Sequence, residues 1–164
     1  MLDASAFIQG YNLDAGEEQF TVPEVHAEVS DEIARLRYEG AVASGRLAEI
    51  SPGKESIKRI ETEVRRLGET KLSPTDRQLL ALALQLREEG LDPVVVSDDY
   101  SVQNTASKLG LGFRSRGARG ISKRLSWVTY CPGCRRTYEL EQEGNVCPIC
   151  GTELKRKPRR GERS

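Results

Sequence analysis

The fold is decided by residues 73–99, which read SPTDRQLLALALQLREEGLDPVVVSDD. Leucine and alanine recur there at i, i+3, i+4 and i+7, which is the spacing of a buried helix face. Ser73 and Pro74 supply an N-cap and a proline at the first helical position, and Gly90 ends the helix. The uninterrupted run Val94–Val96 is typical of a strand that is covered on both faces. A buried helix followed by a buried strand predicts an α/β domain.

Helix and strand signals alternate on both sides of this stretch. Apolar residues before Gly68 share one helix face: Ile57, Ile60, Val64 and Leu67. A helix is also expected to begin at Pro23, another to run over about 101–109, and a last strand to occupy 111–114. Strands that alternate with helices in this way predict a mostly parallel sheet flanked by helices.

The composition indicates a folded protein with two unlike parts. The chain has 164 residues, of which 25 are basic and 25 acidic. Residues 1–110 contain 20 of the acidic and only 12 of the basic residues, so the two parts carry opposite net charges. We expect an α/β body over 1–116, a basic linker over 117–126, a cysteine-containing module over 127–155 and a basic disordered tail over 156–164.

Acidic residues fall where a parallel sheet binds its ligands, outside the carboxyl ends of its strands. Five of them are candidates for a common site: Asp3, Glu28, Asp76, Asp98 and Asp99. Asp3 and the pair Asp98 and Asp99 follow predicted strands, whereas the other two lie on predicted helices. Carboxylates that are gathered in one place repel each other unless a cation lies among them, and oxygen ligands suit Mg²⁺ or Mn²⁺.

Each of these acidic residues also has a purely structural interpretation. Asp76 lies three residues after Ser73, which is the spacing of a capping box. Asp98 or Asp99 could cap the helix that follows them, and Glu28 could be a solvated helix residue. The residues alone leave open whether these side chains converge.

All four cysteines lie near the end of the chain, in two Cys-x-x-Cys pairs with 12 residues between them. They are Cys131, Cys134, Cys147 and Cys150. This spacing predicts a zinc ribbon with four thiolate ligands and one structural Zn²⁺. A module of about 35 residues buries too little apolar surface to fold without the metal. Two disulfides or a redox pair are the alternatives, which a reducing compartment and the presence of two pairs disfavour.

Four motifs resemble the acidic motifs of the PIN-domain ribonucleases: LDASAFI (2–8), VPEVHAEV (22–29), LSPTD (72–76) and VVSDDYSVQN (95–104). With the zinc ribbon behind them, the arrangement is similar to the archaeal "Nin one binding" family of endoribonucleases. The resemblance implies an α/β fold with a PIN-like parallel sheet flanked by helices, followed by a small β zinc ribbon.

The resemblance also implies roles for individual residues. The metal-binding quartet would consist of Asp3, Glu28, Asp76 and Asp99, and Asp98 is a neighbouring candidate. Ser5 would orient the first aspartate, and Asn104 is a candidate for substrate contact. The quartet would bind Mg²⁺ or Mn²⁺ and hydrolyse an RNA phosphodiester, which leaves a 5′ phosphate and a 3′ hydroxyl.

The implied substrate is precursor small-subunit ribosomal RNA, cut near its 3′ end in a pre-ribosomal particle. The alternative is a non-catalytic RNA- or ribosome-binding adaptor with a vestigial acidic pocket, because Ser101 stands where many relatives have a further Asp or Asn. An aspartyl-phosphate phosphatase is disfavoured because the segment from Asp3 to Ser5 lacks the second aspartate of its loop.

Basic residues around the cysteine module are candidates for contacts with the RNA backbone. They are Arg114, Arg116, Arg119, Lys123, Arg124, Arg135, Arg136 and the basic run over 155–160. Trp127, Tyr130 and Tyr138 are expected either to stack on bases or to form the core of the module. We expect a cytoplasmic protein without a membrane partner, because no apolar stretch could span a bilayer and no secretory signal is recognisable.

Overall fold

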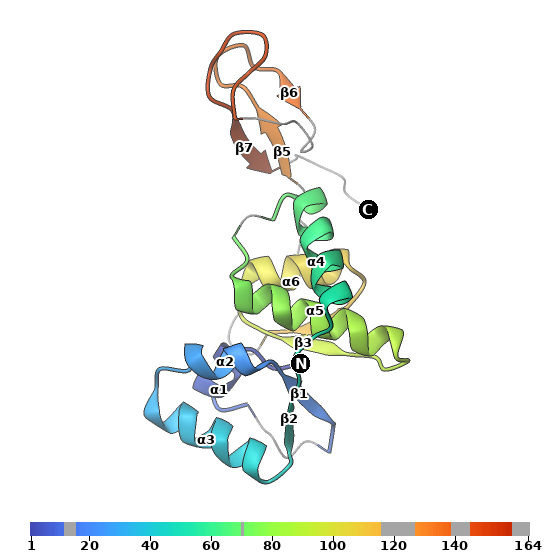
Figure 1. Ribbon diagram of the computed structural model, residues 1–164. Helices are drawn as coiled ribbons and strands as arrows, with labels where there is room; N and C mark the ends of the chain where they lie inside the picture. Colours follow the sequence, from blue (N-terminus) through green and yellow to red (C-terminus); the bar gives the residue numbers. More distant parts are fainter. Residues whose placement is uncertain (12–15, 70, 116–126, 139–144, 159–164) are drawn as a thin grey trace.

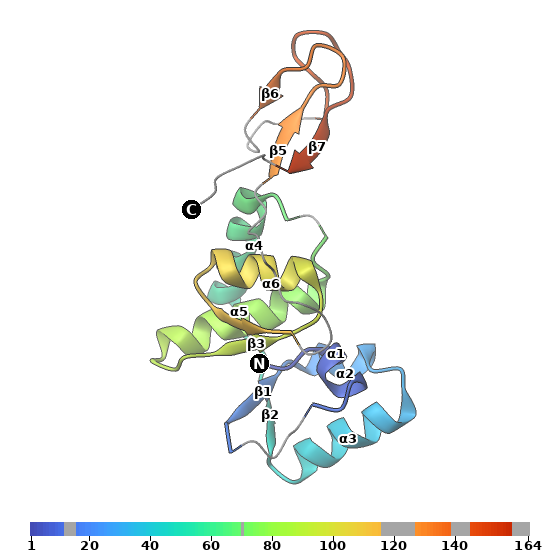
Figure 2. The same ribbon diagram turned by 180° about the vertical axis from the view of Figure 1, so that it is seen from behind.

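The computed structural model describes residues 1–11, 16–69, 71–115, 127–138 and 145–158. It contains an α/β body and a small three-stranded sheet near the C-terminal end of the chain (Figure 1). In the opposite view the small sheet again lies at one end of the molecule, beyond α4 (Lys54–Leu67) (Figure 2). None of the described helices is long and apolar enough to cross a membrane.

The strands of the body pair in parallel. They are β1 (Gln19–Thr21) with β2 (Leu47–Glu49), and β3 (Val94–Val96) with β4 (Gly112–Arg114). Their registers align Phe20 with Ala48 and Val95 with Phe113. The strand expected at 111–114 is confirmed, and so is the parallel pairing.

The first residues of the chain join these two pairs of strands. Leu2 forms an isolated parallel bridge with Val96, and its backbone N–H donates to the carbonyl of Phe20 at 2.9 Å. The hydroxyl of Thr21 donates to the carbonyl of Leu2 at 2.8 Å. The order across the body is therefore β4, β3, residues 1–3, β1 and β2, and Asp3 lies at the carboxyl end of the central segment.

Helices flank these strands, as the alternating pattern predicts. In the described part of the body they are α1 (Ala4–Ile8), α2 (Pro23–Glu28), α3 (Glu32–Ala43), α4, α5 (Pro74–Glu88) and α6 (Tyr100–Lys108). Ser73 and Asp76 form the expected capping box at the start of α5. Gly68 ends α4 in the left-handed conformation, with a φ of 66°, which glycine adopts at little cost.

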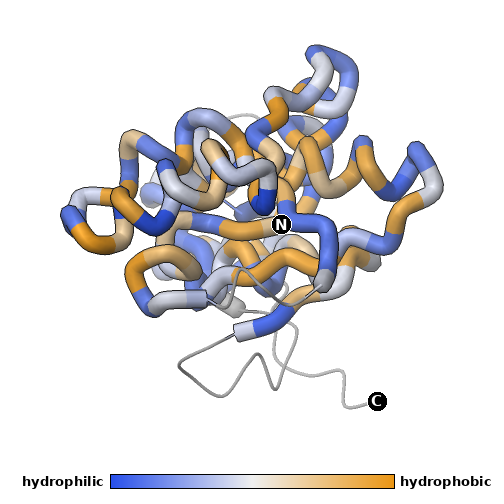
Figure 3. The backbone as a smooth tube through the Cα atoms, turned by 90° about the horizontal axis from the view of Figure 1, so that it is seen from below, coloured by the Kyte–Doolittle hydropathy of each residue, from blue (hydrophilic) through white to orange (hydrophobic). Residues whose placement is uncertain are grey.

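The core of the body is centred on α5. Its buried residues are Leu79, Leu80, Ala81, Leu82, Ala83, Leu84 and Leu86. The helix packs against α4 and also contacts β3 and α6. Figure 3 shows hydrophobic segments running through the middle of the body near the N-terminus. This packing fixes α5, so that its first turn is held at a defined place relative to the sheet.

The C-terminal module is an antiparallel sheet with the order β6–β5–β7. Its strands are β5 (Trp127–Tyr130), β6 (Thr137–Tyr138) and β7 (Lys155–Pro158). The prediction of a disordered tail from residue 156 is wrong for residues 156–158, because they pair with β5. The basic side chains also pack on aromatic rings: the guanidinium of Arg156 lies 5.5 Å from the ring centroid of Trp127, and the ammonium of Lys157 lies 4.7 Å from that of Tyr130.

Candidate functional site

Asp3 lies directly after the Leu2 bridge and caps the first helix. Its Oδ1 accepts hydrogen bonds from the backbone N–H of Ala6 at 3.2 Å and from the Ser5 hydroxyl at 2.6 Å. The contact with Ser5 is the one that the resemblance implies. Burial raises the pKa of the Asp3 carboxyl, although its hydrogen-bond donors lower it in part. A buried carboxylate whose charged form is unfavourable is a site that a cation would stabilise.

Ser97 connects Asp3 with Asp99. The Ser97 hydroxyl accepts a hydrogen bond from the backbone N–H of Asp99 at 3.1 Å, and its side chain is also hydrogen-bonded to the carboxylate of Asp3. Asp99 is the N-cap of α6, and its Oδ1 accepts from the backbone N–H of Ser101 at 2.5 Å. The ends of β3 and of the central segment are therefore held together by one buried serine.

Asp76 adds a carboxylate from α5. Its Oδ2 accepts from the backbone N–H of Ser73 at 2.9 Å, and its own N–H donates to the Ser73 hydroxyl at 3.0 Å. The capping interpretation is thus confirmed, but Asp76 also interacts with other acidic side chains. Burial raises the pKa of Asp76, and the negative charges of Asp99 and Glu28 raise it further. Side chains from α5, α6 and α2 therefore act on one another electrostatically.

Glu28 is the last residue of α2 and is exposed to solvent. A side-chain contact that sequence reasoning missed ties its helix to α5: the amide of Gln78 donates to Glu24 Oε1 at 2.6 Å. The two residues are 54 positions apart in the chain, and no local pattern links them. This contact holds α2 beside the helix that carries Asp76.

Asp98 points to other partners than Asp99 does. Its Oδ1 accepts from the hydroxyl of Ser115 at 2.7 Å, and its Oδ2 accepts from the side-chain amide of Gln9. Its backbone N–H donates to the hydroxyl of Ser5 at 3.2 Å. The side chain of Asp98 thus links the ends of β4 and α1 to the end of β3.

The acidic residues are gathered less tightly than metal ligands in a closed site. Among the described residues, three or more ligand atoms come within 4.8 Å of one another only in the cysteine cluster. The links among the acids are the contacts of Ser97 and the charge effects on Asp76. These side chains offer oxygen ligands, and the carboxyl pKa values of Asp3 and Asp76 are raised. Such a set of ligands suits a hard divalent cation.

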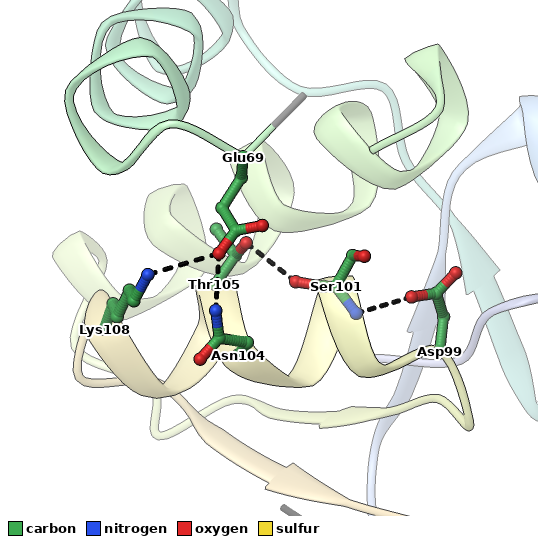
Figure 4. Close-up of polar contacts among 6 residues, drawn as sticks. All are labelled: Glu69, Asp99, Ser101, Asn104, Thr105 and Lys108. Atoms are coloured by element: carbon green, nitrogen blue, oxygen red, sulfur yellow. Dashed lines mark hydrogen bonds and ion pairs between the residues drawn. The ribbon is translucent and has the colours of Figure 1, made fainter. Parts of the chain in front are cut away.

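A buried polar network lies along α6 (Figure 4). Glu69 Oε1 accepts from the side-chain amide of Asn104 at 2.5 Å and from the ammonium of Lys108 at 3.2 Å. The hydroxyl of Thr105 donates to the carbonyl of Ser101 at 2.7 Å. Asn104 is only 5% exposed, so the expectation that it contacts substrate is wrong: its amide is used inside the body.

The four cysteines converge as their spacing predicts. All four sulfurs lie within 4.8 Å of one another, and Sγ–Sγ distances are 3.3 Å for Cys131 and Cys150 and 3.6 Å for Cys134 and Cys147. Thiolates that bind a tetrahedral zinc at ~2.3 Å lie about 3.8 Å apart, so the cluster fits such an ion. The cysteines form no disulfide bonds.

The hydrogen bonds around Cys147 favour its thiolate form. The hydroxyl of Tyr138 lies 3.0 Å from Cys147 Sγ and donates to it when that cysteine is ionised. Burial raises the pKa of Cys147, but the hydrogen bonds from Tyr138 and from the backbone N–H groups of Cys150 and Ile149 outweigh it and lower the pKa to about 6. Tyr138 therefore belongs to the surroundings of the cysteine cluster.

Some of the predicted RNA-contacting residues are exposed in the structure, and others lie outside the described residues. Arg114 is exposed at the end of β4, where it forms an ion pair with Glu17 at 3.7 Å. Arg135 and Arg136 are exposed in the first cysteine loop. The remaining predicted contacts before the ribbon lie outside the described residues: Arg116, Arg119, Lys123 and Arg124. Trp127 and Tyr130 are half-buried, and the basic side chains of Arg156 and Lys157 in β7 pack over their rings.

The sequence agrees with this geometry. A family model described as the PIN domain of ribonuclease matches residues 1–86. The fold and the site thus define a PIN-domain ribonuclease.

Similar proteins of known name show which family of PIN-domain ribonucleases the chain belongs to. Endoribonuclease Nob1 of Methanothermobacter thermautotrophicus is 43% identical over 98% of this chain and 93% of that protein. Endoribonuclease Nob1 of Pyrococcus abyssi is 40% identical over 98% of this chain and 94% of that protein. Ribonuclease VapC1 of Thermoplasma acidophilum is 37% identical over 95% of this chain and 76% of that protein. The chain belongs to the family of the Nob1 endoribonucleases and is an endoribonuclease, not a non-catalytic adaptor.

Proposed function

We propose that this endoribonuclease uses Mg²⁺ or Mn²⁺ to cut precursor small-subunit ribosomal RNA near its 3′ end, within a pre-ribosomal particle in the cytoplasm. The products would carry a 5′ phosphate and a 3′ hydroxyl. One observation carries the metal-dependent chemistry: acids from three helices and the central segment are linked through Ser97 and through their charges on Asp76.

The candidate ligands of the catalytic ion are Asp3, Asp76 and Asp99, with Glu28 nearby. When bound, a divalent ion supplies an activated water and stabilises the leaving 3′ oxygen. The protein side chains orient the ligands. Ser5 and Ser97 hold the carboxylate of Asp3 by hydrogen bonds, and the backbone N–H of Ser73 holds that of Asp76. None of these carboxylates needs to act as a nucleophile.

The cysteine cluster supports a separate, structural Zn²⁺. Four thiolate ligands would leave no open position on the zinc for a reacting water, so we assign the ribbon to RNA attachment and not to catalysis. The exposed Arg135 and Arg136 lie between the cysteine pairs, where they would meet an RNA backbone.

The test is cleavage of a short RNA that spans the 3′ junction of the small-subunit rRNA. The purified protein is incubated with Mn²⁺, with Mg²⁺, or with neither, because a strong chelator would also attack the thiolate site. We expect one specific cut that depends on the divalent ion, and a downstream product that a 5′-phosphate-dependent exonuclease degrades.

Two variants at opposite ends of β3 provide the matched comparison. Asp99→Asn should abolish the cut, whereas Asp92→Asn, at the amino end of the strand, should leave it unchanged. Cleavage without any divalent ion, or cleavage by Asp99→Asn at the normal rate, would refute the metal-dependent mechanism. Cleavage of unrelated RNA at equal rates would refute only the assigned substrate.

A further inference from the structure

The carboxylate of Glu69 is buried to an unusual degree. Its side chain is 5% exposed and that of its partner Lys108 is 11% exposed. Other ion pairs in the described part of the chain are far more exposed: the side chains of Arg59 and Glu88, for example, are 55% and 50% exposed. A buried charge is costly unless it is paired and hydrogen-bonded, and Glu69 has both an ammonium and an amide as donors.

Glu69 lies in the connection that leads to Asp76. It follows Gly68, the left-handed cap of α4, and its backbone N–H donates to the carbonyl of Val64 at 3.0 Å. At the other end of the connection, Ser73 caps α5 and its backbone N–H binds Asp76 Oδ2. Glu69 and Ser73 thus lie at the two ends of a short connection, and the Ser73 end holds the Asp76 carboxylate.

The partners of Glu69 lie on the helix that Asp99 caps. Asn104 and Lys108 are one turn apart on α6, and Figure 4 shows both directed at Glu69, while Asp99 lies at the other end of the helix. The hydrogen bond from the hydroxyl of Thr105 to the carbonyl of Ser101 lies between the contacts of Glu69 and Asp99. Because α5 and α6 also contact each other, the connection and the helix form one unit.

We propose that Glu69 is a positioning residue for the catalytic ion. Its bonds to Asn104 and Lys108 fix the connection before α5 against α6, and so fix the spacing of Asp76 and Asp99. Apolar side chains of similar volume would stabilise the body as well. They would not fix the relative orientation of the two segments as two charge-assisted hydrogen bonds do. The inference rests on the proposed function, since it assumes that both aspartates hold the ion.

The test measures Mn²⁺ binding by isothermal titration and cleavage at increasing Mn²⁺. We expect Glu69→Ala to weaken Mn²⁺ binding about tenfold, as is typical of changes to groups that orient ligands. At saturating Mn²⁺ the cleavage rate should remain within about threefold of the wild-type rate, because the ligands themselves are intact. Glu69→Gln keeps an oxygen acceptor for Asn104 and should retain most of the Mn²⁺ affinity.

The melting temperature separates positioning from simple stability. Glu69→Gln leaves the Lys108 ammonium without a counter-charge, so it should melt lower than wild type and still bind Mn²⁺ well. Leu47→Ala, in the buried start of β2, should lower the melting temperature without weakening Mn²⁺ binding. Wild-type affinity in Glu69→Ala, or equal losses in Leu47→Ala, would overturn the inference while leaving the proposed function intact. Absence of Mn²⁺ binding in the wild-type protein would overturn both.

Discussion

Asp98 and Asp99 are neighbours in the chain, but their carboxylates serve different parts of the molecule. Asp99 caps α6 and its charge acts on Asp76, whereas Asp98 accepts hydrogen bonds from Gln9 and Ser115. Sequence alone leaves open which of the pair faces the site. The partners of each carboxylate favour Asp99 as the ligand and Asp98 as a link between the ends of β4 and α1.

This difference predicts unequal effects of the same substitution. Asp99→Asn should lower metal-dependent cleavage by about 100-fold or more, while an asparagine still caps α6 and preserves the fold. Asp98→Asn should lower the free energy of unfolding by about 1 kcal/mol and leave cleavage within about threefold of wild type. Single-turnover cleavage and urea unfolding measure the two effects. If Asp98→Asn were the more damaging change to cleavage, the roles would be reversed.

Asp3 should make the protein without divalent ions less stable at neutral pH. Burial raises the folded-state pKa of Asp3 above its ordinary value of 3.8, so ionisation costs folding free energy. The cost is absent below the unfolded-state pKa, where both states are protonated, grows as the pH rises between the two pKa values, and is fully present above the folded-state pKa. Asp3→Asn should therefore melt higher than wild type at pH 7, and the difference should vanish near pH 3.5.

The same variant should lose cleavage entirely, because it lacks a charged ligand. Thermal unfolding without added Mg²⁺ or Mn²⁺, monitored by circular dichroism from pH 3.5 to 8, checks the stability effect. Added Mn²⁺ should raise the melting temperature of wild type but not that of Asp3→Asn. A lower melting temperature for Asp3→Asn at pH 7 would contradict this account.

Tyr138 should help to retain the zinc. Its hydroxyl lies 3.0 Å from Cys147 Sγ, and hydrogen bonds to ligands commonly change metal affinity by 10–100-fold. Tyr138→Phe should lose zinc to a coloured chelator at a concentration about tenfold lower than wild type requires. Tyr130→Phe is the matched control, since the ring of Tyr130 packs against Lys157 in the same sheet. Equal retention in both variants would show that the hydroxyl has no such role.

The arginines of the first cysteine loop should contribute to RNA affinity through charge. Arg135→Ala with Arg136→Ala should weaken RNA binding and flatten its dependence on salt by about 0.7 per lost phosphate contact. Arg35→Ala, an exposed change on α3, serves as the control. Filter binding between 50 and 300 mM salt measures the slopes. An unchanged slope in the double variant would remove these arginines from the RNA contacts.

Local patterns predict most of the body. The capping box of Ser73 and Asp76, the left-handed Gly68 and the run Val94–Val96 fix the ends of α5, α4 and β3, and each is read from neighbouring residues. The cysteine cluster is predictable for a similar reason, because thiolate spacing in a zinc knuckle is a local constraint.

Contacts between distant parts of the chain escape sequence reasoning. The bond between Glu24 and Gln78, and the burial of Asn104 against Glu69, depend on how helices pack. The pairing of β7 with β5 could not be predicted either. A run of lysine and arginine predicts a solvated tail, and the contacts of Arg156 and Lys157 with aromatic rings are visible only in the structure. The charge effects of Asp99 and Glu28 on Asp76 also belong to this group, and a family resemblance was needed to expect these acids near one another.

The bridge between Leu2 and Val96 has a consequence for how the enzyme is made. The central segment gains its second neighbour only after a stretch of chain 94 positions later has been synthesised. Closing so long a loop is slow compared with forming a helix, and it comes late in translation. Under the proposed ligand assignment, a nascent polypeptide that has already emerged with Asp3, Glu28 and Asp76 still lacks Asp99, so its metal site is completed only when the body is nearly complete.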